Sequence, residues 1–348
     1  MEEKCLSNAL KSVKTWNYSE VREALTNIYL EPVTLAKKVK RKNVVRYLVK
    51  LDKTYEVLSK VFEVLNVLPD PNTLSPFYAE LLAISGITDY KSLYLRLRGF
   101  KKVVRRLWKY YRIRVKLALT SEEAKKDLRE FIGRSLSIVR RLNKDLRKLE
   151  VAVNELRKLP CIDFTSLKIV VSGMPQVGKS TLVGRISTSK PEVSPFPFTT
   201  KNIISGHLQI DHMRVQVFDT PGILDRPISE LNEIEKRALV AIKFLADVII
   251  YLVDPRPSSY YTIDQQIDLL QMIKAMFGDK PILVVINKVD ETPEERLAEV
   301  LRLVKNVHND EPYKISALKG VGVDSLLEWI RNKCIEFYAN NVSKGVTP

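Results

Sequence analysis

The sequence predicts an α/β fold, with a doubly wound and mostly parallel sheet, preceded by an all-α helical bundle that carries a basic surface. Residues 1–160 contain few glycines and place their apolar side chains at helical spacing. From Leu167 onward, short apolar strands alternate with helical stretches, as in a parallel sheet with helices on both faces. We therefore expect a basic helical domain over residues 1–160 and an α/β domain over residues 167–340.

A long helix should close the first domain, with one side buried. Its apolar side chains step by three or four residues, which keeps them on one side of an α-helix. They are Val139, Leu142, Leu146, Leu149, Val153 and Leu156. Basic side chains fill the opposite side: Arg140, Arg141, Lys144, Arg147 and Lys148. Three prolines between Leu68 and Pro76 interrupt the earlier helices, which restart at Phe77.

The formal charge of +16 comes entirely from the first domain. Residues 1–160 hold 35 Lys and Arg against 18 Asp and Glu, whereas residues 161–348 hold 22 against 23. This asymmetry indicates a module that binds a polyanion, with nucleic acid or an anionic membrane surface as the candidate partners. A well-solvated helical surface without a partner is the other interpretation.

Two further basic clusters occupy Lys37–Lys42 and Arg96–Lys116. The second cluster contains aromatic residues, which can stack on splayed bases but on a helix more often pack inside a bundle. We expect Trp108 in the bundle interior. Tyr110 and Tyr111 stay open between the two interpretations.

The second domain should contain six strands and five helices. Strands are expected near 167–173, 203–211, 213–219, 248–254, 281–287 and 313–316. Helices are expected after the glycine-rich loop and near 230–245, 262–277, 293–307 and 323–339. The strand that begins at Met213 should pair with its neighbour as a hairpin.

The segment Gly173–Ser180 matches GxxxxGK[ST], a glycine-rich loop whose backbone N–H groups surround phosphate oxygens. It follows the apolar run Leu167–Val171 and precedes a helical stretch, which is the context the motif requires. Lys179 should reach the β- and γ-phosphates, helped by the dipole of the helix that begins there. The expected nucleotide contacts are Gly173, Pro175, Gln176, Val177, Gly178, Lys179, Ser180 and Thr181.

Three later segments identify the nucleotide as guanine: Asp219–Gly222, Asn287–Asp290 and Ser316–Ala317. The first two each follow a predicted strand, which makes a chance match of the whole set negligible. The Asp290 carboxylate can accept from both N1–H and the 2-amino group of guanine, a pairing that adenine lacks. Charge-assisted bonds of this kind contribute roughly 1.5 to 3 kcal/mol each. The set predicts a P-loop GTPase domain.

The other residues of these segments should complete the base site. Asn287 and Lys288 should brace the loop and cover the base. The N–H of Ala317, which follows Ser316, can donate to guanine O6.

A magnesium ion should lie beside the phosphates. Ser180 supplies one hydroxyl, and Asp219 should hold the ion through a water. A second hydroxyl should come from the loop Pro197–Thr200, which offers two threonines. The N–H of Gly222 should contact the γ-phosphate and so sense its loss.

Ile223 follows Gly222, the last residue of the Asp219–Gly222 (DxxG) segment, at a position where Ras-type enzymes carry a glutamine that orients water. Isoleucine cannot polarise water. We therefore expect slow intrinsic hydrolysis unless a partner, a monovalent cation or a rearranged loop supplies the missing group.

With these residues in hand, the chain resembles the nucleolar GTP-binding protein (Nog) family, in the Obg-like branch of translation-associated GTPases. In the second domain the resemblance rests on Phe198–Lys201, Asp219–Pro227 and Asn232–Glu235, and in the first on Ser75–Leu81. It implies that Thr200, the second threonine of the Phe-Thr-Thr motif, is the metal ligand. It also implies that the protein acts in assembly of the large ribosomal subunit. The helical domain would then bind ribosomal RNA, and a precursor subunit would be the partner.

Two departures from that family affect what can be carried over. Relatives usually have Asn where this chain has Gln176, and that Asn is associated with potassium stimulation, so a K⁺ requirement stays open. The chain also ends at Pro348, without the long C-terminal extension of eukaryotic members. We therefore expect an archaeal-type, cytoplasmic form, nucleolar only in a eukaryote.

Other residues give weaker indications about the setting of the protein. Cys5, Cys161 and Cys334 are far apart and odd in number, which favours a reducing compartment. The N-terminus lacks the apolar core of a signal peptide, so we expect a soluble protein. Two other functions stay open: a membrane-associated GTPase that uses the basic helices on anionic lipid, and an RNA-binding scaffold with a structural nucleotide site.

Overall fold

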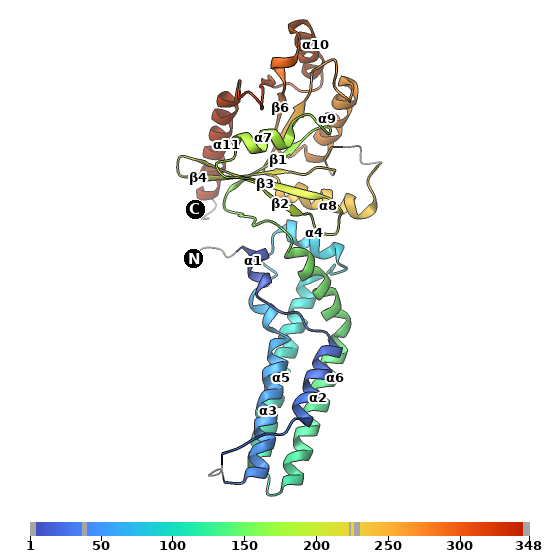
Figure 1. The fold of residues 1–348 in the computed structure, drawn as a ribbon, viewed down its shortest axis with the longest axis vertical. Helices are drawn as coiled ribbons and strands as arrows, with labels where there is room; N and C mark the ends of the chain where they lie inside the picture. The colour runs from blue at the N-terminus through green and yellow to red at the C-terminus, as the bar shows by residue number, and fades with distance from the viewer. Residues whose placement is uncertain (1–4, 37–39, 223, 226–229, 344–348) are drawn as a thin grey trace. The chain divides into compact units, whose positions relative to one another are not determined.

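The computed structural model describes residues 5–36, 40–222, 224–225 and 230–343, and they form two compact units. One unit holds residues 6–75 and 82–157 and is helical (Figure 1). The other holds the described residues from Lys158 onward, together with Cys5 and Pro76–Leu81. The division into domains 1–160 and 167–340 stays a prediction. The two compact units differ from it in one respect, since Pro76–Leu81 groups with the second unit.

The helical unit is a bundle built on three long helices. Its elements are α1 (Leu6–Lys11), α2 (Tyr18–Leu30), α3 (Lys42–Lys60), the 3-10 turn η1 (Glu63–Asn66), the end of α4 (Pro76–Ile84), α5 (Tyr90–Leu117) and α6 (Ser121–Leu156). Thr120 starts α6 with a capping box, in which its hydroxyl accepts from the N–H of Glu123 and the Glu123 carboxylate accepts in return. The six predicted stripe residues of α6 are all buried, which confirms the apolar stripe.

Aromatic packing in the bundle answers what the sequence left open. Trp108 stacks on Tyr55 at 4.4 Å between ring centroids, and its Nε1 donates to Asp52 at 2.8 Å. Tyr111 is fully buried and its hydroxyl donates to Glu130 at 3.1 Å. Tyr110 is half exposed. Of the three aromatic residues, Tyr111 is closed to a stacking base, Trp108 is half-buried in its contact with Tyr55, and Tyr110 is the most exposed.

The second unit is an α/β domain with a seven-stranded sheet in the order β2-β3-β4-β1-β5-β6-β7. The strands are β1 (Leu167–Ser172), β2 (Glu192–Pro195), β3 (Asn202–Ile210), β4 (Met213–Asp219), β5 (Val248–Val253), β6 (Ile282–Ile286) and β7 (Tyr313–Lys314). Strands β4, β1, β5, β6 and β7 are parallel, and β2 and β3 are antiparallel, with Ile210 opposite Met213 in the predicted hairpin. The mostly parallel sheet is confirmed, and β2 is an addition that the sequence did not predict.

Helices lie on both faces of this sheet, with α7 and α8 on opposite sides in Figure 1. The helices and turns are α7 (Lys179–Ile186), α8 (Glu233–Leu245), α9 (Ile263–Phe277), η3 (Val289–Glu291), α10 (Glu294–Lys305) and α11 (Val323–Ser343). All six residues of β1 and of β5 are buried, as expected for central parallel strands covered on both faces. Among the described residues, no helix is both long and apolar enough to cross a bilayer.

The segment Pro76–Leu81 belongs to the α/β unit through aromatic contacts. Phe77 and Tyr78 lie 6.4 Å and 5.5 Å from the Phe164 ring, between centroids. Phe77 is fully buried, and burial raises the pKa of the Tyr78 hydroxyl. These rings anchor the start of α4, whose first residue is Pro76.

Candidate guanine-nucleotide site

The predicted phosphate loop connects β1 to α7, the strand-loop-helix context that the motif requires. Gly178 is the N-cap of α7 with φ +103°, and a Cβ there would stand 2.3 Å from the Asn287 amide nitrogen. Only glycine fits that position. Lys179, the first residue of α7, is buried, and its Nζ donates to the Gly173 carbonyl at 2.8 Å and the Met174 carbonyl at 3.0 Å. The ammonium therefore lies inside the loop, where phosphate is expected.

Two acidic side chains, Asp219 and Asp225, act on the pKa of that ammonium in the direction opposite to burial. Burial is the main cause and lowers the pKa of Lys179, and the negative charges of Asp219 and Asp225 offset part of this effect. The Lys179 Nζ lies 3.9 Å from Asp225 Oδ2. Asp225 was not among the predicted site residues, because it lies in the Asp219–Pro227 stretch that carries the family resemblance but outside the four nucleotide-binding segments.

The residues predicted to hold magnesium are arranged for a hydrated ion. Ser180 Oγ donates to Asp219 Oδ2 at 2.5 Å. Asp219 ends β4 and is fully buried, and burial raises its pKa. Its other oxygen, Oδ1, has no hydrogen-bond partner among the described residues. A buried, unpartnered carboxylate oxygen beside a hydroxyl fits Mg²⁺, which binds through one or two protein ligands and waters.

The two candidate threonines in the loop after β2 differ in their hydrogen bonds. Thr199 Oγ1 donates to the Phe196 carbonyl at 3.1 Å and accepts from the Lys201 N–H at 3.1 Å. Thr200 is exposed, and no hydrogen bond of its hydroxyl is found among the described residues. Thr199 therefore stabilises the turn of its own loop, and of the two threonines Thr200 is the one whose hydroxyl has no partner within the described part of the chain.

Gly222, the last residue of the Asp219–Gly222 segment, has φ +80°. The Lys201 side chain covers it so closely that an added Cβ would stand 2.6 Å from Lys201 Cδ. The Gly222 N–H, predicted to sense the γ-phosphate, donates to Asp225 Oδ2 at 2.8 Å. Ile223, the residue in place of the water-orienting glutamine, lies outside the described residues.

Asn287 links the phosphate loop to the Ser316–Ala317 segment, which was predicted to contact the base. Its Nδ2 donates to the Val177 carbonyl at 2.8 Å, and its Oδ1 accepts from the Ala317 N–H at 2.9 Å. Asn287 thus braces the loops as predicted. The Ala317 N–H, however, points at Asn287 in this structure, so its predicted bond to guanine O6 requires a shared or redirected hydrogen bond.

Lys288 has φ +61°, and its side chain contacts the phosphate loop. Its Nζ donates to the Gln176 carbonyl at 2.6 Å and to Asp254 Oδ2 at 2.8 Å. Asp254 also pairs with Arg256, and these bonds lower its pKa although burial opposes them. Asp254 was missed in the sequence, although its place just after β5 is where ligand sites of such sheets form.

Asp290, the predicted base reader, remains a charged carboxylate. Hydrogen bonding from Ser316 is the main cause that lowers the pKa of Asp290, and Lys319 adds to it. Lys319 Nζ lies 3.0 Å from Asp290 Oδ2, and this lysine is exposed. A charged acceptor with one exposed and displaceable partner suits recognition of two guanine N–H donors.

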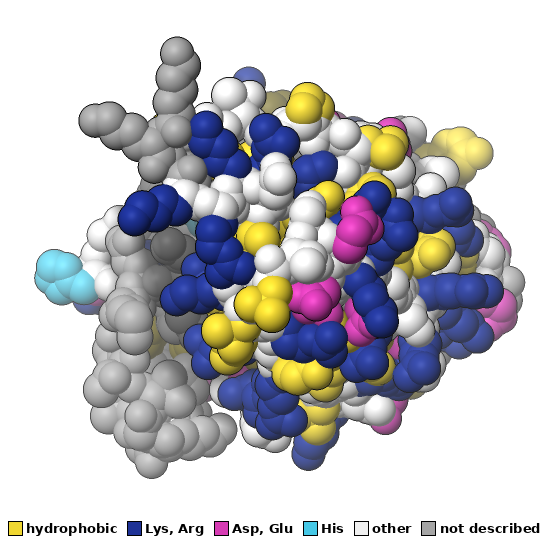
Figure 2. All heavy atoms as spheres, turned by 90° about the horizontal axis from the view of Figure 1, so that it is seen from below, with side chains coloured by type: hydrophobic (Ala, Val, Ile, Leu, Met, Phe, Trp, Pro, Cys, Tyr) yellow, Lys and Arg dark blue, Asp and Glu magenta, His cyan; other side chains and the backbone are white. Residues whose placement is uncertain are grey.

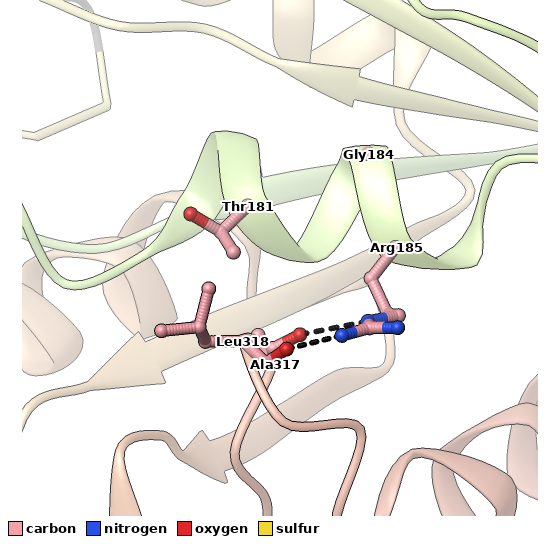
Figure 3. A pocket seen from close by; sticks show the side chains of 5 residues that line it. All are labelled: Thr181, Gly184, Arg185, Ala317 and Leu318. Carbon is pink, nitrogen blue, oxygen red and sulfur yellow. Dashed lines mark hydrogen bonds between the residues drawn. The ribbon is translucent and has the colours of Figure 1, made fainter.

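A cavity of about 310 Å³ lies between α7 and the loop after β7. It is lined by Thr181, Gly184, Arg185, Ala317 and Leu318 (Figure 3). Arg185 Nε donates to the Ala317 carbonyl at 3.0 Å, and Nη2 donates to the Leu318 carbonyl. Of the five, Thr181 and Ala317 were predicted. Arg185 was not, since a surface arginine of a helix carries no motif signal.

Comparisons with known proteins agree with both halves of this description. The model of the NOG1 N-terminal helical domain matches residues 30–163, and that of Nucleolar GTP-binding protein 1 matches residues 233–290. An uncharacterised protein of Methanocaldococcus jannaschii is 36% identical over 243 residues, which cover 69% of this chain and 67% of that protein. Nucleolar GTP-binding protein 1 of Saccharomyces cerevisiae is 33% identical over 267 residues, covering 75% of this chain and 41% of that protein.

The same name recurs among other relatives. Nucleolar GTP-binding protein 1 of Drosophila melanogaster is 33% identical over 250 residues, with 70% of this chain and 38% of that protein covered. The chain thus spans about two fifths of the length of these two eukaryotic relatives. A solved structure described as a nucleolar GTP-binding protein 1 from Plasmodium falciparum is 28% identical, covers 54% of this chain and 94% of that chain, and has a TM-score of 0.43.

The family matches join the two parts of the chain that the motifs and the fold describe separately. The helical unit matches the family's own N-terminal helical domain, and the sheet carries the guanine-nucleotide motifs of a P-loop GTPase. This chain is a GTP-binding protein, and it belongs to the nucleolar GTP-binding protein 1 family.

Proposed function

We propose that this protein is a GTP-hydrolysing assembly factor of the large ribosomal subunit. It docks on ribosomal RNA of a precursor subunit through its basic N-terminal helices, and the bound nucleotide sets docking or release. The relatives from Drosophila melanogaster and Saccharomyces cerevisiae are named nucleolar GTP-binding proteins, and the nucleolar setting in their names supports such a role. For this chain we propose a cytoplasmic setting.

One observation carries the RNA part of the proposal: exposed cations of α5 and α6 that form no ion pair with an acidic side chain among the described residues. On α6, Arg140, Lys144 and Arg147 are exposed, and no ion pair of theirs is found within the described part of the chain. The same holds on α5 for Arg98, Lys102, Arg105, Arg106, Lys109 and Lys116. Figure 2 shows Lys and Arg side chains predominating over Asp and Glu on the face in view. Such cations bind phosphates by releasing counterions.

The hydrolysis part rests on the site geometry. Lys179, Thr200 and Gly222 are the groups that we propose act on the γ-phosphate, and Ser180, Thr200 and Asp219 would hold Mg²⁺. When bound, the ion neutralises charge on the phosphate oxygens. The chain's own contribution is to position the phosphates with the buried Lys179 ammonium and the loop N–H groups.

Anionic membrane is the second candidate, and one observation favours it. Ile113, Leu117 and Leu119 are 61%, 69% and 86% exposed at the end of α5 and just beyond it, among basic residues. Apolar side chains beside cations can enter a lipid interface. Against this, the long apolar stripe of α6 faces the bundle interior, and no Trp or Phe lies among the exposed residues of α5.

Co-sedimentation separates the two candidates. The full chain, loaded with GDP or with a non-hydrolysable GTP analogue, is mixed at moderate salt with large ribosomal subunits or with vesicles of phosphatidylglycerol and phosphatidylcholine. We expect pelleting with the subunits, at a level that depends on the nucleotide, and little with the vesicles. Pelleting with vesicles alone would overturn the RNA proposal and support the membrane one.

A further inference from the structure

Asp225 lies where it can compete with the terminal phosphate of GTP. It is only 6% exposed, and it comes from the loop after β4, outside the four segments predicted to bind the nucleotide. We infer that Asp225 is a specificity-determining residue that weakens GTP binding relative to GDP, because its carboxylate takes the hydrogen-bond donors that the γ-phosphate needs. This inference rests on the proposed binding of guanine nucleotides at the same site.

The geometry turns on a single carboxylate oxygen. Asp225 Oδ2 accepts from the Gly222 N–H at 2.8 Å and lies 3.9 Å from Lys179 Nζ. These are the two groups assigned to the γ-phosphate, and they come from different elements, the loop after β4 and the start of α7. A carboxylate oxygen and a phosphoryl oxygen accept from the same donors. A single N–H cannot serve both at full strength.

A local turn alone does not account for this arrangement. A bond from a backbone N–H to a carboxylate three residues later is common in capping boxes at helix starts, but there the carboxylate usually faces solvent. Here it is buried and faces an ammonium from a distant part of the sequence. The neighbouring Asp219 differs, since its Oδ2 accepts from Ser180 and its Oδ1 is buried without a partner among the described residues.

The two nucleotides should respond differently to Asp225. GDP has no γ-phosphate, so it does not need the Gly222 N–H. GTP must displace the carboxylate from Gly222 and place more negative charge beside it. Removing the Asp225 charge should therefore tighten GTP binding and leave GDP binding nearly unchanged.

The test is the ratio of dissociation constants for GDP and for the β,γ-imido analogue of GTP, measured with Mg²⁺ on the full chain by calorimetry. In Asp225→Asn, which keeps the shape and one acceptor oxygen, we expect the ratio Kd(GDP)/Kd(analogue) to rise about tenfold, the lower end for a charge-assisted bond. Asp225→Ala, which also removes the acceptor, should raise it at least as far. Asp268→Asn, an exposed position on α9, removes the same charge and should leave the ratio unchanged.

The outcomes separate this inference from the function beneath it. If the parent chain binds neither nucleotide, the proposed site itself is wrong. If the parent binds both, while the Asp225 variants keep GDP affinity and show an unchanged or lowered ratio, Asp225 does not compete and the inference falls alone. Retained GDP affinity in either variant reports that the site is folded, so loss of fold in one variant leaves the other decisive.

Discussion

Asn287 and Val177 join two of the loops of the nucleotide site through a buried hydrogen bond, 2.8 Å from the Asn287 amide to the Val177 carbonyl. The same side chain accepts from the Ala317 N–H on its other side. One amide therefore connects the phosphate loop, the loop Asn287–Asp290 and the loop after β7. Each of these loops follows a different strand of the sheet, so their relative positions depend on this residue.

Replacing Asn287 by Ala should destabilise the α/β unit as well as weaken nucleotide binding. The Val177 carbonyl and the Ala317 N–H would both lose a buried partner, at about 1 to 3 kcal/mol each. Urea unfolding of Asn287→Ala, compared with Asn306→Ala at an exposed position, measures the loss. Equal stability of the two variants would show that water replaces the amide at no cost.

Asp290→Asn should change the preferred base from guanine to xanthine. Xanthine presents a carbonyl at C2 where guanine has an amino group, and an amide can donate there. Dissociation constants for GDP and for xanthosine diphosphate, measured on parent and variant, test the assignment. If the variant still prefers GDP as strongly as the parent, the base is read by another group.

Hydrolysis of GTP by the isolated chain should be slow, because Ile223 cannot orient water. In single-turnover assays we expect Ile223→Ala to change the rate little, while Lys179→Ala, which removes the buried ammonium, abolishes it. Addition of ribosomal particles shows whether a partner supplies the missing group. A large loss in Ile223→Ala alone would reveal a structural role for that side chain.

Acid should destabilise the protein through His308. Burial is the main cause that lowers the pKa of His308 from its ordinary 6.5, with a further contribution from Lys274 and an opposing one from Asp310. The unfolded chain therefore binds a proton more readily, so unfolding becomes easier as pH falls from about 6.5 toward the lowered pKa. Urea unfolding of the parent and of His308→Gln between pH 7.5 and pH 5 tests this, because the variant should lose less stability. Identical pH profiles would contradict it.

Local patterns predicted the parts of the fold that they determine directly. The α6 stripe and the buried strands β1 and β5 follow from periodicity and apolar composition, and the structure confirms them. The strand β2 was missed because four residues, including an edge proline, give too short a pattern. The membership of Pro76–Leu81 in the α/β unit was missed because it depends on the distant Phe164 ring.

The candidate site shows the same division. Motif residues such as Lys179 and Asn287 could be named in advance because their spacing is fixed by the loop they build. Asp225, Asp254 and Arg185 could not, since each acts through a contact that only the folded chain creates. The engagement of the Ala317 N–H with Asn287 likewise depends on how two loops meet.

The salt dependence of RNA binding tests the central claim, docking through the basic helices, most directly. Filter binding of the full chain to large-subunit ribosomal RNA at several salt concentrations gives the slope of log affinity against log salt. Changing Arg140, Lys144 and Arg147 together to Ala should weaken binding and lower the slope by about 2 to 3, close to one for each phosphate that is no longer neutralised. The matched triple change of Lys190, Arg302 and Lys314, exposed on the α/β unit, should keep the parental slope. A parental slope in the α6 variant, or a reduced slope only in the matched control, would contradict docking through this face.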